Sequence, residues 1–151
     1  DYMTLLEKIN NDMITYMKSK DSFSLGVIRM VKGAIQLEKI NKKRDLTDDE
    51  VISVISKQIK MRNDSINEFA KANREDLIEQ NKKEIALLST YMPAQLSELE
   101  INKIIDDAFN TVNPTSSKDM GLIMKEVSPK LKGKADMGKV NNIIKERLAN
   151  L

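Results

Sequence analysis

Residues 47–69 read TDDEVISVISKQIKMRNDSINEF, and this stretch carries the clearest helical pattern in the chain. Its apolar residues recur at steps of three and four, which is the spacing of one face of an α-helix. Thr47, followed by two aspartates and Glu50, is typical of a helix start, because both side chains can cap free backbone amides. The pattern predicts a helix of about six turns from Thr47 to near Lys71.

The same spacing extends on both sides of this helix, and we find no strand candidate. Only five glycines and three prolines interrupt it in 151 residues. We expect one helix capped by Thr4 and a second capped by Ser22 or Ser24 before residue 47, and a helix capped by Asn73 after it. Residues 3–92 are therefore predicted to form a four-helix unit built from long helical hairpins.

A break in the helical pattern follows at Tyr91 to Ser97. Pro93 disfavours helical geometry at the residue before it, and Ser97 with Glu100 starts a new helix. Two more short helices follow, one from Ser117 to Ser128 that is closed by Pro129, and one capped by Asp136. We therefore predict an all-α chain with a domain division before Pro93 and a three-helix unit over residues 93–151.

The composition excludes much of enzyme chemistry. The chain has no cysteine and no histidine, which rules out a cysteine nucleophile, disulfides, thiolate or imidazole zinc sites and a Ser-His-Asp triad. The nearest remaining nucleophile pattern, Ser116-Ser117-Lys118, is typical of a helix cap. The adjacent carboxylates Asp48-Asp49 and Asp106-Asp107 point in different directions on a helix. We predict no catalytic residue, no metal ligand and no cofactor.

Charge and hydropathy give an expectation about location. No stretch approaches the roughly 20 apolar residues that span a membrane. From Met3, which we take as the natural start after Asp1 and Tyr2, there is no basic region followed by an apolar run. The net charge of +2 gives no overall attraction to nucleic acid or membrane. We expect a cytoplasmic protein with no membrane partner.

An excess of basic residues in the C-terminal part of the chain indicates a phosphate-binding surface. Between Lys118 and Arg147 there are eight basic and four acidic residues. Lysines alternate around Gly133 just before a helix start, where ammonium groups add to the positive end of the helix. No aromatic residue interleaves them, so binding would follow shape and phosphate rather than base stacking. The alternative is that Asp136 takes the helix amides and the lysines are only solvated. The candidate nucleic-acid-binding residues are Lys125, Lys130, Lys132, Lys134 and Lys139.

Three other features have structural interpretations. A second basic cluster lies near residue 42 and suits the negative end of a helix. Arg29, among apolar neighbours, is expected to be partly buried and paired with Asp64 or Glu68. The methionines on apolar stripes are expected to pack in the core, and they are Met13, Met17, Met30 and Met120. The second basic cluster consists of Lys32, Lys39, Lys42, Lys43 and Arg44.

Several short runs resemble a known family in their order and spacing. They are VIRM at residues 27–30, DSINEF at 64–69, YMPAQLS at 91–97, DMG at 119–121 and PKLKGKAD at 129–136. Together they resemble the YqeY family across essentially Met3 to Leu151. The last two also resemble the tail domain that this family shares with the GatB subunit of glutamyl/aspartyl-tRNA amidotransferase. The chain departs from the family at Asn73, where glycine is usual.

The resemblance implies a small all-helical protein whose C-terminal unit is similar to the tRNA-contacting tail of that subunit. The amidotransferase chemistry lies in other domains and another subunit. We therefore expect a non-catalytic RNA-associated module whose partner is tRNA or a tRNA-amidation complex. One alternative is a protein-interaction adaptor, which would expose an apolar stripe at Leu122, Val127 and Leu131. Another is an amidotransferase or amidase that acts alone through Ser117 or Lys118.

Overall fold

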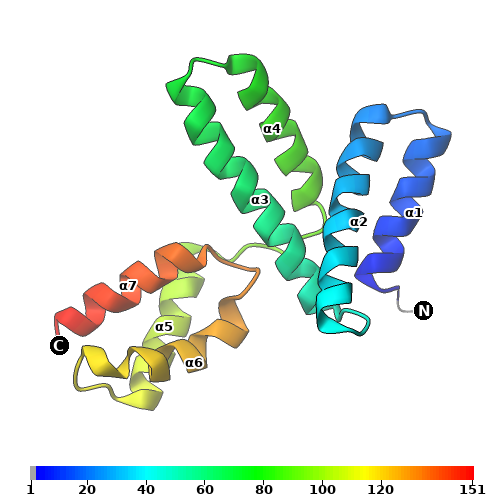
Figure 1. Cartoon of the computed structure of the whole chain (residues 1–151). Coiled ribbons are helices and arrows are strands. Elements are labelled where there is room, and N and C mark those ends of the chain that lie inside the picture. Colours follow the sequence, from blue (N-terminus) through cyan, green and yellow to red (C-terminus); the bar gives the residue numbers. More distant parts are fainter. Residues whose placement is uncertain (1–2) are drawn as a thin grey trace. The chain divides into compact units, whose positions relative to one another are not determined.

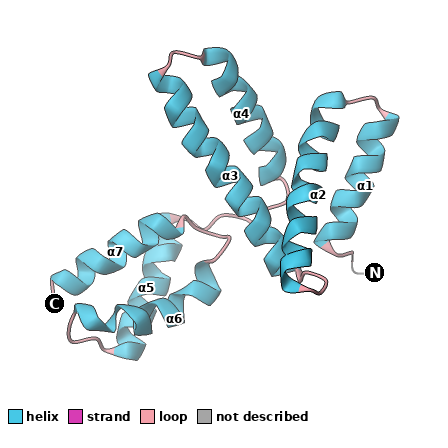
Figure 2. Ribbon diagram, viewed as in Figure 1, coloured by secondary structure: helices cyan, strands magenta, loops and turns pink. Residues whose placement is uncertain are grey.

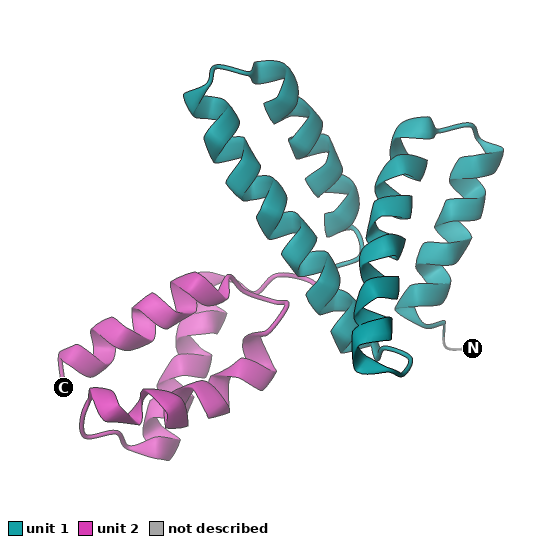
Figure 3. Ribbon diagram, viewed as in Figure 1, with its two compact units in different colours: residues 1–92 teal, residues 93–151 magenta. Residues whose placement is uncertain are grey.

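The computed structural model describes residues 3–151, which form two compact units. The first unit ends at Met92 and the second runs from Pro93 to Leu151 (Figure 3). All regular structure in this range is helical (Figure 2), so the prediction of an all-α chain is confirmed. Across the same residues, no helix is both long and apolar enough to span a bilayer. The expectation about Asp1 and Tyr2 falls outside the described residues.

The first unit consists of two helical hairpins. Helix α1 (Leu5–Lys18) pairs with α2 (Ser22–Lys42), and α3 (Asp48–Lys71) pairs with α4 (Glu75–Ser89). The hairpins meet where α2 contacts α3, and they diverge toward their tips (Figure 1). The core lies at this meeting point, and its buried residues are Ile9, Val27, Ile28, Val31, Ile35, Val51, Ile55, Leu88 and Tyr91.

Side-chain caps set where most of these helices begin. The Thr47 hydroxyl accepts from the Glu50 amide at 3.2 Å and the Glu50 carboxylate accepts from the Thr47 amide at 2.9 Å, so the predicted capping box is confirmed. Thr4 caps α1 as expected. The predicted serine cap of α2 is wrong, because Asp21 accepts from the Ser24 amide at 3.0 Å and takes that role.

Both hairpin turns use a left-handed residue that is not glycine. Lys20 has φ 58° after α1, and the next amide, that of Asp21, donates to the Tyr16 carbonyl at 3.0 Å. Asn73 has φ 56° after α3, and the amide of Arg74 donates to the Phe69 carbonyl at 2.9 Å. This is the Schellman ending of a helix. Asn73 therefore ends α3, and its predicted role as the cap of α4 is wrong.

The second unit packs three helices around its own core. They are α5 (Glu98–Val112), α6 (Met120–Leu131) and α7 (Met137–Ala149), and the short 3₁₀ helix η1 (Ser117–Asp119) precedes α6. The Ser97–Glu100 capping box at α5 and the Asp136 cap at α7 are confirmed. The buried core residues are Ile105, Ala108, Ile123, Val127, Leu131, Val140, Ile144 and Leu148.

Two predictions about the middle helix of this unit are wrong. Ser116, not Ser117, provides the cap, and it caps η1 rather than α6. Helix α6 continues through Pro129 to Leu131 instead of closing at the proline. Proline fixes φ near the helical value and removes one hydrogen bond, and the complete burial of Leu131 favours the extra half turn.

Candidate nucleic-acid interface

The candidate surface is built on the turn between α6 and α7, residues 130–136, which we call the basic turn. Gly133 adopts φ 77°, a left-handed conformation that favours glycine. The Lys134 carbonyl accepts from the Leu96 amide at 2.9 Å, and the Gly133 carbonyl accepts from Gln95 Nε2 at 3.0 Å. The segment before α5 therefore holds the backbone of the basic turn in place.

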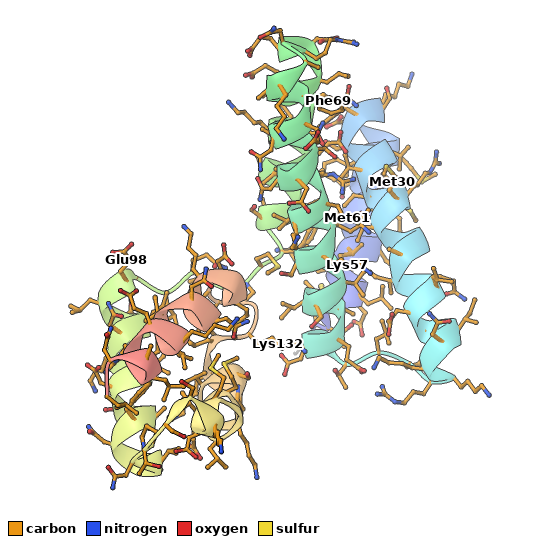
Figure 4. All side chains as sticks on the ribbon, turned by 60° about the vertical axis from the view of Figure 1, so that its left-hand side comes forward. Met30, Lys57, Met61, Phe69, Glu98 and Lys132 are labelled. Atoms are coloured by element: carbon orange, nitrogen blue, oxygen red, sulfur yellow. The ribbon has the colours of Figure 1, made fainter. Side chains whose placement is uncertain are left out.

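The lysine side chains on and near this turn are free of carboxylates. All five predicted residues are exposed, and none lies within 4.0 Å of a carboxylate oxygen in the part of the chain that the structure describes. Lys132 stands at the end of α6 in Figure 4. Arg147 differs from them, because it pairs with Asp106 at 2.6 Å and stacks 4.5 Å from the centre of the Phe109 ring.

The five lysines are not one cluster. Lys130 is in the last turn of α6, Lys132 and Lys134 flank Gly133, and Lys139 is in the first turn of α7. These four lie within ten residues of one another in sequence around one turn. Lys125 is five residues before Lys130, which places the two on different faces of α6.

The backbone amides at the start of α7 do not add to this surface. The Asp136 carboxylate accepts from the Gly138 amide at 2.9 Å and from the Lys139 amide at 3.3 Å. An oxyanion at this position would compete with a side chain that already caps the helix. Of the two predicted contributions to phosphate binding, the structure retains the ammonium groups and not the helix amides.

Three of the five residues of the second basic cluster form ion pairs. Glu50 accepts from Arg44 at 2.7 and 2.9 Å and pairs with Lys42 at 3.2 Å. Lys39 pairs with Asp45 at 2.9 Å. The Arg44 guanidinium, with the Thr47 amide, holds the pKa of the Glu50 carboxyl well below its usual range. These pairs fasten the α2–α3 connection, whereas Lys32 and Lys43 have no carboxylate oxygen within 4.0 Å among the described residues.

The buried arginine is not the predicted one. Arg29 is exposed, and both of its expected partners, Asp64 and Glu68, pair with lysines of their own helix. Arg62 of α3 is buried instead and donates to Glu84 of α4 at 3.0 Å. Arg62 and Glu84 fall on the apolar stripes of their helices, and this position in the sequence could have indicated that they are buried. A polar residue at such a position is buried with a partner.

The side chains nearest to a catalytic pattern, at residues 115–119, form hydrogen bonds with neighbouring backbone amides. Ser116 accepts from the Lys118 amide, and Asp119 accepts from the amides of Thr115 and Ser116. Hydrogen bonds from these backbone amides lower the pKa of Asp119. Among residues 3–151, no group of three or more acidic side chains is arranged to hold a metal ion. The local bonding is that of a helix start.

Two predictions about which apolar side chains are exposed or buried are wrong. Of the stripe that the adaptor alternative requires, Leu122 is exposed, but Val127 and Leu131 are fully buried in the core. The expectation that Met17 and Met30 pack in the core is also wrong, because half or more of each residue is exposed. Exposed apolar surface therefore lies mainly on the first unit.

Comparison with known proteins gives a consistent family match. The model of the family described as YqeY-like protein matches residues 6–148. Altered inheritance of mitochondria protein 41, mitochondrial, from Pyrenophora tritici-repentis is 31% identical over 134 residues, which are 87% of this chain and 73% of that protein. The protein of that name from Lachancea thermotolerans is 30% identical over 89% of this chain and 72% of its own length.

A third relative of the same name bears on location. The Kluyveromyces lactis protein is 35% identical over 94 residues, which are 62% of this chain and 51% of that protein. All three relatives are named as mitochondrial proteins, and this contradicts the expectation of a cytoplasmic protein. That expectation relied on the start of a sequence that spans only part of each relative.

Proposed function

Because this chain belongs to the YqeY family, we propose that it is a non-catalytic RNA-associated module that engages tRNA, or a tRNA-amidation complex, through the basic turn. One observation carries the proposal. Four exposed lysines without carboxylate partners surround a turn whose backbone is fixed, and they are Lys130, Lys132, Lys134 and Lys139.

The physical basis is phosphate recognition. Free ammonium groups on a fixed backbone can neutralise several phosphates without first breaking an ion pair. No aromatic side chain lies among these lysines in the sequence, so base stacking is not offered. Contacts would then follow the shape and backbone of a folded RNA rather than its base sequence. The resemblance of this unit to the tail of the amidotransferase subunit makes tRNA the first RNA to test.

The experiment measures binding of the purified protein to labelled tRNA by fluorescence anisotropy at two salt concentrations. Bulk tRNA, tRNA from mitochondria and a DNA duplex are compared, the second because of the names of the relatives. We expect tRNA to bind more tightly than the duplex. Changing Lys132, Lys134 and Lys139 to Glu is expected to weaken binding at least tenfold for every RNA sequence and to reduce the salt slope by about 1 per lysine.

A matched control separates local from overall charge. Lys18, Lys20 and Lys83 are exposed lysines of the first unit without carboxylate partners among the described residues. Changing these three to Glu alters the net charge by the same amount, and we expect near wild-type affinity. Equal losses in the two triple variants, or no binding at low salt, would contradict the proposal. Glutamine hydrolysis by the pure protein, abolished by a change of Ser117 or Lys118, would contradict the non-catalytic assignment.

A further inference from the structure

Helix α2 carries a second apolar face that takes no part in the core. Val27, Ile28, Val31 and Ile35 face the core of the first unit. Six other residues recur at alternating steps of three and four, which is the spacing of a coiled-coil seam. We call them the α2 stripe, and they are Phe23, Gly26, Met30, Gly33, Leu37 and Ile40.

The α2 stripe is exposed along its whole length. Phe23 is 42% exposed, Met30 is 57% exposed, and Leu37 and Ile40 are each 60% exposed. Contiguous apolar surface of this kind on a helix marks a contact with another molecule more often than single exposed side chains do. From Phe23 to Ile40 the stripe extends about 26 Å, which matches a partner helix of about five turns.

The two glycines suit close approach by another helix. A Cβ atom added at Gly26 or at Gly33 would meet no atom within 4 Å. The space above both positions is therefore open, and the intact core does not require glycine there. Small residues at one position of each repeat let a second helix approach the backbone, while Met30 and Leu37 provide the larger contacts.

Two positive side chains near the stripe have no carboxylate partner. Arg29 directly precedes Met30, and Lys57 of α3 is likewise exposed; neither lies within 4.0 Å of a carboxylate in residues 3–151. In Figure 4, Met61 and Lys57 lie on the side of α3 toward α2, and Met30 lies on α2. A contact of 3.9 Å between Arg62 Nη2 and Met30 Sδ joins the stripe to α3.

The nearby acidic groups do not balance this charge, since each is already paired. Asp64 pairs with Lys60 at 3.0 Å, and Glu38 lies 3.9 Å from Lys42. A second copy of the chain would bring its own arginine and lysine to the same place, which is unfavourable. Acidic residues beside an apolar stripe on the partner would be attracted.

We propose that the α2 stripe is the docking site for an amphipathic helix of a partner protein, with acidic residues flanking the partner's apolar face. The site is on the first unit and is separate from the RNA-binding role proposed for the basic turn. The partner helix lies along α2 with its apolar residues against Met30 and Leu37. Its carboxylates pair with Arg29 and Lys57.

The test uses two designed 21-residue amphipathic peptides and the full chain. Both peptides have leucine at the seam positions, and the flanking positions are glutamate in one and lysine in the other. Binding of each labelled peptide is measured by fluorescence anisotropy. We expect the glutamate peptide to bind at least tenfold more tightly than the lysine peptide. We expect the R29E/K57E variant to reverse this preference.

A second variant tests the apolar contacts. M30E/L37E is expected to weaken binding of the glutamate peptide at least tenfold. L99E/L122E adds the same charge at exposed leucines of the second unit and is expected to bind like the wild type. Circular dichroism establishes that each variant is folded, and the tRNA titration establishes that the basic turn is unaffected.

Three outcomes would overturn the proposal. The first is failure of the glutamate peptide to bind at 100 µM peptide, roughly the weak limit for a specific site. The second is equal binding to the wild type and to M30E/L37E. The third is a dimer in sedimentation velocity that M30E/L37E dissolves, which would assign the stripe to a second copy. Loss of tRNA binding in K132E/K134E/K139E does not bear on this site.

Discussion

Arg62 and Glu84 form the one ion pair between described residues in which both side chains are nearly fully buried, at 7% and 11% exposed. Arg62 also donates to the backbone carbonyl and the side-chain oxygen of Gln58, each at 3.0 Å. Gln80 donates to the second oxygen of Glu84 at 3.3 Å. The network joins α3 to α4 beyond the apolar core. Such a pair is expensive to break because one charge is then buried alone.

Changing Arg62 to Met should therefore lower the free energy of unfolding by about 3–5 kcal/mol, because the Glu84 carboxylate loses its partner. The double variant R62M/E84M should recover most of this loss, since neither charge remains. Urea unfolding followed by circular dichroism measures both. A single variant as stable as the wild type would show that the pair contributes nothing to the hairpin.

Folding changes the titration of Tyr91. Its hydroxyl donates to the Asp12 carboxylate at 2.5 Å. Burial and then this carboxylate raise the pKa of Tyr91 well above its usual value of 10.0. Because the folded pKa is the higher one, the contribution to stability is fully present below about pH 10 and is lost as the pH rises further.

The Tyr91→Phe variant should lose the hydrogen bond and, with it, part of the alkaline sensitivity. We expect its free energy of unfolding to be lower at pH 7 by about 1.5–3 kcal/mol, the range for a hydrogen bond to a charged group. Between pH 9 and 11 its stability should fall less steeply than that of the wild type. Parallel pH curves for the two proteins would assign the alkaline loss to other groups, such as Tyr16, whose pKa is also raised.

At the scale of the helix, the left-handed endings give a testable expectation. Lys20 and Lys43 have φ 58°, a conformation that side chains with a Cβ adopt at some cost. Changing either lysine to Gly should raise the free energy of unfolding by up to about 1 kcal/mol, and the melting temperature by about 2–4 °C. Differential scanning calorimetry measures the change. Lys18→Gly, inside α1, is the control and should destabilise.

The helix starts show what the sequence can predict. Thr47 and Ser97 were identified correctly because each is followed by a glutamate that completes a capping box, and the signal is local. Asp21 was missed because Ser22 and Ser24 follow it, and both aspartate and serine cap helices. Asn73 was misplaced because its positive φ ends one helix, whereas its residue type also suits the start of the next. Sequence spacing alone does not distinguish these roles.

The sequence likewise predicts some features of the candidate site and not others. The exposure of the five lysines follows from their residue type, so the sequence places them on the surface. The sequence left open whether Asp136 caps the amides of Gly138 and Lys139. Only the hydrogen-bond geometry shows that it does. The α2 stripe was missed as a surface, because Met30 was expected to pack in the core. Which face of a broad apolar helix is covered depends on its neighbours.

At the scale of the whole molecule, the two units have separate cores that share no residue. Ile55 is fully buried in the first and Ile144 in the second. Ile55→Ala should lower the protection of amides against hydrogen exchange in α1 to α4, by the loss of about 2–5 kcal/mol of local stability, and should leave α5 to α7 unchanged. Ile144→Ala should do the reverse. A uniform loss across both units in either variant would mean that they unfold as one.

The contact between Tyr91 and Asp12 can form only late in the synthesis of the first unit. Asp12 leaves the ribosome 79 residues before the hydroxyl that it binds. At about 5–20 residues per second, α1 and α2 wait several seconds with their shared apolar face incomplete. Until α3 and α4 emerge, the nascent hairpin lacks Val51, Ile55 and Leu88 from its core. The first unit is therefore open to chaperones, or to premature association, until the chain has passed Tyr91.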